Sequence, residues 1–222
     1  MVNNFAPQAF TRQDESDDGN FYVAPRMVVH IDDTAIAAVT DAIRRHVPTD
    51  ARILDIMSSY RSHLPEKAHY QEVVGLGMNE AELQANAQLT RFVVHNLNKE
   101  PRLPFEDAQF DAVINTVSVQ YLKRPVEVFR EVARVLKPGG VSLVSFSDRM
   151  FPTKAVRIWY EGDNESHIAL VQRYYELAGG FAKVEVERHV DEQASWFRRG
   201  HDPLFVVIGT RASKSENDKP KE

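Results

Sequence analysis

The sequence predicts an α/β protein whose sheet is mainly parallel. Over residues 52–146, short apolar runs that end in polar residues alternate with amphipathic helical patterns. This alternation is typical of right-handed βαβ units, in which successive strands lie parallel. The last two apolar runs of the chain have no helical pattern between them that is long enough for a crossover. These two strands are therefore expected to pair antiparallel.

The first half of the chain is expected to begin with a helix and then alternate. Asp32 or Asp33 can cap this helix, whose apolar residues recur at spacings of three and four until Pro48 stops it. Asn79 is placed to cap a second helix, and Glu82 completes the pattern of a capping box. Strands are expected at residues 52–57, 72–76 and 91–95. Only a brief helix fits between the first two strands.

The second half continues the alternation and then changes character. A helix with Pro125 in its first turn is expected to end at residues 137–140, which read Lys-Pro-Gly-Gly. Another helix from about His167 is expected to end at Gly179 and Gly180, which readily adopt the left-handed cap conformation. The strands of this half are expected at residues 110–115, 141–146, 182–189 and 204–210.

Composition and charge narrow the class of protein. A chain of 222 residues that is 43% hydrophobic can bury one core of ordinary size, which favours a single domain over residues 21–211. Residues 1–20 are expected to be a mobile arm, residues 21–50 a lid and helix segment, and residues 212–222 a disordered tail. A net charge of −5 gives no electrostatic reason to expect nucleic acid or an anionic membrane as partner.

Cysteine usage and hydropathy bear on location. The chain has no cysteine, which excludes disulfides and thiolate metal sites and is compatible with the cytoplasm. No apolar run approaches the roughly 18 residues that a membrane span needs. A soluble cytoplasmic protein is therefore expected. Histidines and carboxylates show no recognised ligand spacing, so no metal site is expected, and the oligomeric state stays open.

Residues 53–65 contain the first candidate site. Asp55 ends an apolar run and is followed by Ser58 and Ser59, as expected where a buried parallel strand runs into a ligand-binding loop. Loops that wrap a nucleotide usually contain glycines, which permit tight bends, but this loop has none. Residues 21–30 combine aromatic side chains with an arginine and a histidine. They can form a lid over a site or an edge segment packed on the core.

Several motifs in combination resemble one family. The chain reads L-D at the end of the first strand, then V-V-G-L-G-M-N, L-P-F-E-D-A-Q-F-D-A-V and R-V-L-K-P-G-G, all within residues 53–146. This succession resembles class I S-adenosylmethionine-dependent methyltransferases of the small-molecule, type 11 kind. The resemblance implies a Rossmann-like seven-stranded, mainly parallel sheet with helices on both faces and an antiparallel C-terminal strand. It also implies S-adenosylmethionine as cofactor and S-adenosylhomocysteine as product.

The resemblance also implies the cofactor contacts. Asp55 keeps the acid that ends the family's first strand, whereas a glycine-free, divergent run replaces the glycines that follow it. The family's second strand usually ends in an acid that binds the ribose, and Gly77 stands at that place. Asn96 stands near the adenine position. The implied cofactor contacts are Asp55, Met57, Ser58, Ser59, Gly77, Met78, Asn79, Asn96, Leu97 and Thr116.

The activity implied is methyl transfer to a small-molecule acceptor by in-line displacement. A general base is needed only if the acceptor must lose a proton, and the candidates are His63, Tyr60 and His30. The expected substrate contacts are Tyr22, Arg26, Gln120, Tyr121 and Arg149. The divergent cofactor positions leave an alternative open, a catalytically inactive protein of this fold that binds another ligand or a protein partner. The polar run of residues 58–63 favours activity over this alternative.

Overall fold

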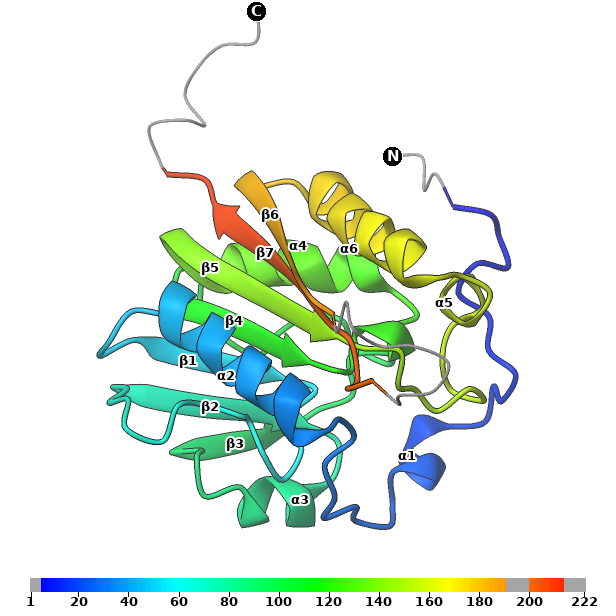
Figure 1. The fold of residues 1–222 in the computed structure, drawn as a ribbon, viewed down its shortest axis with the longest axis horizontal. Helices are drawn as coiled ribbons and strands as arrows, with labels where there is room; N and C mark the ends of the chain where they lie inside the picture. The colour runs from blue at the N-terminus through cyan, green and yellow to red at the C-terminus, as the bar shows by residue number, and fades with distance from the viewer. Residues whose placement is uncertain (1–4, 191–199, 214–222) are drawn as a thin grey trace, which may run out of the picture.

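One seven-stranded sheet organises the chain, of which the computed structural model describes residues 5–190 and 200–213 (Figure 1). The strands are β1 Arg52–Ile56, β2 Glu72–Gly77, β3 Arg91–Val94, β4 Phe110–Thr116, β5 Leu136–Phe146, β6 Phe181–His189 and β7 Leu204–Arg211. Their order across the sheet is β3-β2-β1-β4-β5-β7-β6. Most of the expected disordered tail lies outside the described residues, from position 214 onward.

The direction of the strands confirms the expected fold class. Strands β1 to β5 pair parallel wherever they are neighbours. Strand β7 runs antiparallel to both β5 and β6, with Leu143 opposite Ile208 in the first pair and Val186 opposite Val207 in the second. The sheet is therefore parallel except for its C-terminal strand.

Helices cover both faces of the sheet, as expected. The helices are α1 Asp18–Phe21, α2 Asp33–His46, α3 Glu80–Ala85, the 3-10 turn η1 Val119–Tyr121, α4 Pro125–Val135, α5 Arg157–Tyr160 and α6 Asn164–Ala178. In Figure 1, α2 crosses in front of the sheet, whereas α4 and α6 lie behind it. Each face has its own buried apolar cluster, one beneath α2 and the other beneath α4 and α6.

The helix ends follow the expected caps, with one exception. Asp32 accepts a hydrogen bond from the backbone N–H of Ala35 (2.9 Å), and Gly179 ends α6 with a φ of 72°. Asn79 accepts from the backbone N–H of Glu82 at 3.1 Å. The reciprocal half of the capping box is not formed, because the Glu82 carboxylate accepts hydrogen bonds from residues outside the helix.

Two connections differ from expectation. Residues 57–71, all of which the structure describes, form no helix between β1 and β2. Instead the chain turns back at once, and the Ser58 N–H donates to the carbonyl of Leu76 on β2 at 2.9 Å. Helix α6 begins at Asn164, three residues before the expected start at His167, because Asp163 caps it by accepting from the Ser166 N–H.

The N-terminal arm, residues 5–20, follows the surface of the domain, and its expected mobility stays a prediction (Figure 1). Phe5 packs edge to face on Tyr174 of α6, with ring centroids 5.9 Å apart. Asp18 pairs with Arg12 at 2.8 Å and lies 3.5 Å from Nζ of Lys154, whose side chain is fully buried. The polar composition of the arm concealed this docking, because Lys154 lies far away in sequence.

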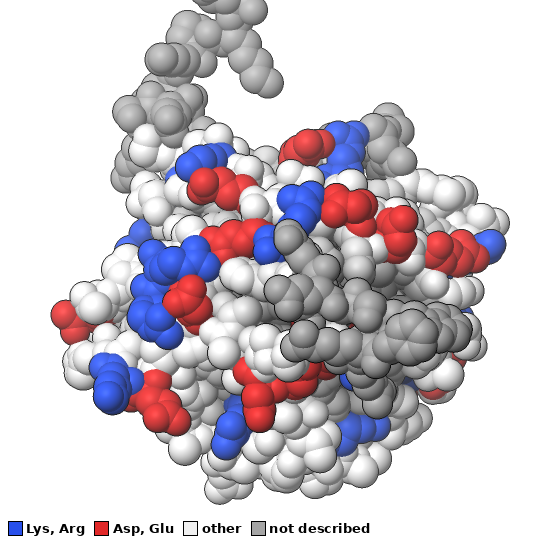
Figure 2. All heavy atoms as spheres, in the orientation of Figure 1, with Lys and Arg blue, Asp and Glu red and all other residues white. Residues whose placement is uncertain are grey.

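Charges of both signs are interspersed on the face of the molecule that Figure 2 shows. On α2, for example, Arg45 pairs with Asp41 at 2.9 Å and with Glu187 of β6 at 2.6 Å. Since neighbouring charges of opposite sign cancel at a distance, this face has no strong field of one sign.

Candidate functional site

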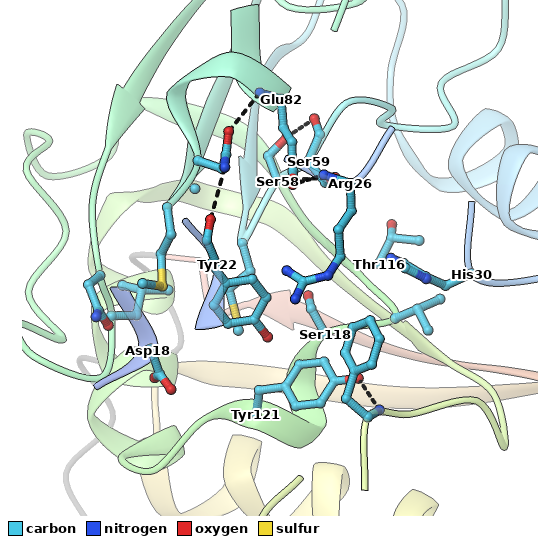
Figure 3. Close-up of a pocket in the computed structure, with 18 of the residues that line it drawn as sticks. Asp18, Tyr22, Arg26, His30, Ser58, Ser59, Glu82, Thr116, Ser118 and Tyr121 are labelled. Atoms are coloured by element: carbon cyan, nitrogen blue, oxygen red, sulfur yellow. Dashed lines mark hydrogen bonds between the residues drawn. The ribbon is translucent and has the colours of Figure 1, made fainter. Parts of the chain in front are cut away.

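A cavity of about 300 Å³ opens at the carboxyl ends of β1, β2 and β4 (Figure 3). Its wall contains Met57, which directly follows β1, and Gly77 and Thr116, which end β2 and β4. This edge is where open parallel α/β sheets bind ligands. Residues 21–30, called the lid below, pass over the cavity and contribute Tyr22, Arg26 and His30 to its lining.

Most of the expected site residues meet in this cavity. It is lined by Tyr22, Arg26, His30, Met57, Ser58, Ser59, Gly77, Met78, Asn79, Asn96, Leu97, Thr116, Tyr121 and Arg149. Three others, Asp55, Tyr60 and His63, line a smaller adjoining pocket of about 60 Å³. Gln120 is fully buried, and its amide donates to the carbonyls of Val117 and Arg149.

Sequence reasoning missed several residues of the cavity wall. These are Asp18, Glu82, His95, Val117, Ser118, Met150 and Phe151. Val117 and Ser118 follow β4 directly, so the rule that ligands bind at strand ends would have found them. Asp18 gave no such signal, because its place depends on ion pairs with distant residues.

The turn after β1 is built without glycine. Met57 has a φ of 56°, and Val117 at the end of β4 has a φ of 49°. Both values lie in the left-handed region, which is strained for a side chain branched at Cβ such as that of valine. The backbone at Met57 thus adopts a conformation that glycine adopts without strain, although the sequence has no glycine there.

The loop after β1 leaves room only for glycine at position 77. A Cβ atom at this position would lie 2.2 Å from the carbonyl oxygen of Ser58, far inside van der Waals contact. An acidic side chain, which the family usually carries here, has no room. The backbone of residues 57–59 occupies the space beside the end of β2. The absence of an acid at position 77 and the altered loop after β1 therefore depend on each other.

The polar side chains of the strand-end loop, residues 55–62, bond mainly within the protein. The buried Oδ2 of Asp55 accepts from the hydroxyls of Ser58 (2.7 Å) and Ser62 (2.6 Å). Burial raises the pKa of Asp55 to about 7, although both hydroxyl bonds act to lower it. The Ser59 hydroxyl donates to Glu82 at 2.8 Å. Neither hydroxyl proton of the expected pair, Ser58 and Ser59, is free to hold a ligand carboxylate.

Asn79 and Glu82 tether the lid. The Asn79 amide donates to the carbonyls of Tyr22 (2.9 Å) and Val23 (3.2 Å), and Glu82 accepts from the Arg26 N–H at 2.7 Å. These bonds occupy the amide that was expected to reach a ribose. Val23 and Val28 are 73% and 54% exposed, so the segment does not pack its apolar side on the core. Tyr22, Arg26 and His30 of this segment line the cavity, and its role as a lid stays a prediction.

The three candidate bases differ in position and protonation. His30 lines the cavity, with its ring 5.2 Å from that of Phe151, and burial lowers its pKa. His63 faces the smaller pocket, where burial lowers its pKa to about 4. Both imidazoles are therefore neutral near pH 7. Tyr60 also faces the smaller pocket, which leaves His30 as the candidate base in the main cavity.

Two of the expected substrate contacts beyond β4, Tyr121 and Arg149, already bond to other groups of the protein. Burial raises the pKa of Tyr121 to about 12, and its hydroxyl accepts from the Phe151 N–H at 2.9 Å. Tyr121 therefore stays protonated in the cavity wall. The guanidinium group of Arg149 is held by Asp202 at 2.7 Å.

The order of the strands, with one antiparallel strand near the C-terminus, and the cavity at the strand ends are those of the class I methyltransferase fold. Residues 57–144 match the model of the family described as a methyltransferase domain. The chain has the class I methyltransferase fold, and S-adenosylmethionine is the cofactor of this class.

Individual relatives resemble parts of the chain. Malonyl-[acyl-carrier protein] O-methyltransferase of Marinomonas is 31% identical over 30% of this chain and 25% of its own length. Ubiquinone/menaquinone biosynthesis C-methyltransferase UbiE of Bartonella quintana is 33% identical over 49% of this chain and 37% of its own. The chain thus spans well under half the length of these relatives.

A solved structure extends the likeness of fold. A chain from the complex between the Haloferax volcanii Trm112 methyltransferase activator and a methyltransferase superposes with a TM-score of 0.60. The match covers 81% of this chain and 90% of that one at 16% sequence identity.

Proposed function

We propose that this chain transfers a methyl group from S-adenosylmethionine to a small-molecule acceptor in the cavity beneath the lid. The observation that carries the proposal is the cavity of about 300 Å³ at the strand ends of a methyltransferase fold. Pockets for small molecules and cofactors begin at about this volume. Relatives of similar sequence include the ubiquinone/menaquinone biosynthesis C-methyltransferase UbiE of Bartonella quintana, which supports a small acceptor.

The lining of the cavity fits the cofactor. Each oxygen of the Glu82 carboxylate accepts one hydrogen bond from the protein, so each retains acceptor capacity for a hydroxyl or an ammonium group. Met57, Met78 and Leu97 supply apolar surface for the rest of the molecule. Glu82 thereby offers the carboxylate that Gly77 cannot.

The bound cofactor supplies most of the reactivity, so the protein has few chemical steps to catalyse. S-adenosylmethionine supplies a methyl group already activated by its sulfonium. The protein therefore needs mainly to align the acceptor and exclude water, which the tethered lid does by covering the cavity. Where the acceptor must lose a proton, the neutral His30 takes it, since it is the candidate base that lines the main cavity.

We also propose a cytoplasmic protein that acts on small molecules without a nucleic-acid partner. The absence of cysteine and the interspersed surface charges support this. In the part of the chain that the structure describes, no helix is both long and apolar enough to cross a membrane.

Turnover tests the proposal. Wild-type protein is incubated with S-adenosylmethionine and a panel of small phenols, amines and carboxylic acids, and the S-adenosylhomocysteine formed is quantified. Formation that depends on one acceptor class supports methyl transfer. Binding of the cofactor without turnover for any acceptor supports the inactive alternative. No binding of S-adenosylmethionine or S-adenosylhomocysteine by calorimetry contradicts the proposal.

A further inference from the structure

Arg26 is the cationic side chain at the centre of the cavity. Its guanidinium carbon lies 4.5 Å from the ring centroid of Phe21 and 5.4 Å from those of Tyr22 and Phe151. One end of the guanidinium, Nη2, donates to the carbonyl of Phe21 at 2.8 Å. In Figure 3 the group reaches into the pocket from the lid, toward the side where Ser118 and Tyr121 lie. The rings and this bond hold the guanidinium in one orientation.

Two polar atoms on this side of the cavity lack partners. Nη1 of Arg26 and Oγ of Ser118 are both buried, and neither has a hydrogen-bond partner within the described structure. Ser118 as a whole residue is 8% exposed and lines the same cavity. Buried polar atoms are ordinarily satisfied, so an unpartnered pair in one cavity indicates a ligand group that bonds to both.

Other cations near the cavity are already neutralised. Arg149 pairs with Asp202 at 2.7 Å. Lys154 is enclosed by Asp14 at 3.0 Å and Asp18 at 3.5 Å. Among the ion pairs of the described residues, none involves Arg26. Its charge is thus available, and its planar N–H groups suit the oxygens of a carboxylate.

We propose that Arg26 and Ser118 together bind a carboxylate inside the cavity. Nη1 of Arg26 donates to one carboxylate oxygen, and the Ser118 hydroxyl donates to the other. The carboxylate belongs either to the amino-acid end of the cofactor or to the methyl acceptor. The proposal rests on the proposed function for the identity of the cofactor, but the binding of a carboxylate by these two residues is measured separately.

The first arm of the test compares two cofactor-like ligands by calorimetry. S-adenosylhomocysteine has a carboxylate, whereas 5′-methylthioadenosine has the same nucleoside and thioether without the amino-acid end. If the cofactor supplies the carboxylate, Arg26→Gln weakens binding of S-adenosylhomocysteine by about tenfold or more and leaves 5′-methylthioadenosine unchanged. Ser118→Ala has the same selective effect with a smaller factor, because it removes a neutral donor.

The second arm tests the acceptor as the source. Benzoate and its neutral isostere benzamide are titrated into wild-type protein with and without S-adenosylhomocysteine. An aromatic probe is used because Tyr121 and Phe151 stack in the wall with centroids 6.0 Å apart. If the acceptor supplies the carboxylate, wild type binds benzoate at least about tenfold more tightly than benzamide, and Arg26→Gln abolishes that preference.

Matched variants separate binding from folding. Arg26→Lys keeps the charge but loses the planar fork, so it is expected to retain part of the preference. Arg173→Gln removes an arginine that pairs with Glu176 on α6, outside the cavity, and is expected to keep the wild-type preference in both arms. If Arg26→Gln changes neither preference, the proposal is overturned. If wild type binds benzoate selectively but no adenosine ligand, the proposed cofactor fails while the carboxylate site stands.

Discussion

The strand-end loop and the lid face the same cavity and are both rich in polar side chains, yet their polar groups find different partners. In the loop, the Asp55 carboxylate accepts hydrogen bonds from the hydroxyls of Ser58 and Ser62. In the lid, Nη1 of Arg26 has no partner among the described residues. The comparison teaches that a high number of polar residues in a stretch of sequence is a poor predictor of a ligand site. The polar atoms left unsatisfied after folding mark it better.

The largest expected effect concerns the arm that leads into the lid. Replacing Asp18 with Ala leaves Arg12 and Lys154 without their buried partner, so the free energy of unfolding should fall by about 3–5 kcal/mol. Chemical denaturation measures it. Glu15→Ala, which removes the half-exposed pair with Lys123, should cost less than about 1 kcal/mol. Equal losses in the two variants would show that the buried cluster does not hold the arm.

The next effect concerns which of the two histidines, His30 in the lid or His63 in the smaller pocket, acts as the general base. His30→Ala should lower kcat by about a hundredfold or more with an acceptor that must lose a proton. His63→Ala, whose side chain belongs to the smaller pocket, should lower kcat less than tenfold. Steady-state rates with the acceptor found by the panel provide the measurement. The reverse order of effects would move the base from His30 in the lid to His63 in the smaller pocket.

A smaller effect tests the contact between the loop and β2. Gly77→Ala places a methyl group against the Ser58 carbonyl, so unfolding should become easier by about 1–3 kcal/mol. Gly162→Ala is the matched control, since its nearest contacts would lie at 3.3 Å and an alanine there needs only slight adjustment. If both variants unfold at the same denaturant concentration as wild type, the loop does not exclude a side chain from position 77.

The last effect is a change in the pH dependence of stability. The pKa of Asp55 rises from its ordinary 3.8 to about 7 on folding, so the native state binds the proton more tightly. This contribution to stability is complete below about pH 4 and is lost as pH rises through 7. Asp55→Asn stays neutral and should flatten the fall in unfolding free energy between pH 4 and 8. Parallel pH profiles for wild type and variant would mean that Asp55 does not titrate in this range.

The strands could be predicted from the sequence because each depends on the pattern of apolar residues within a short stretch of chain. Apolar runs of period and length typical of buried strands predicted the sheet, and Asp32 predicted a cap that the structure confirms. The strand-end loop was not readable, since its shape depends on the left-handed backbone at Met57 and on the close approach of Ser58 to Gly77. Both arise from packing between strands.

The docking of the arm shows the same limit for charged residues. Lys154 and Asp18 are separated by most of the chain, and each alone has the sequence appearance of a surface residue. Only the fold brings them together and buries them. The role of Glu82 was hidden similarly, because its local pattern favoured a helix cap while its carboxylate bonds to the lid and the loop.

Amide hydrogen exchange with and without S-adenosylhomocysteine tests most directly that the ligand lies in the cavity beneath the lid. The expected result is slower exchange in residues 21–30, 57–59 and 116–118, which surround the cavity, and unchanged exchange in β6 at the far edge of the sheet. Unchanged exchange in these three segments at a saturating ligand concentration would contradict the assignment of this cavity as the site.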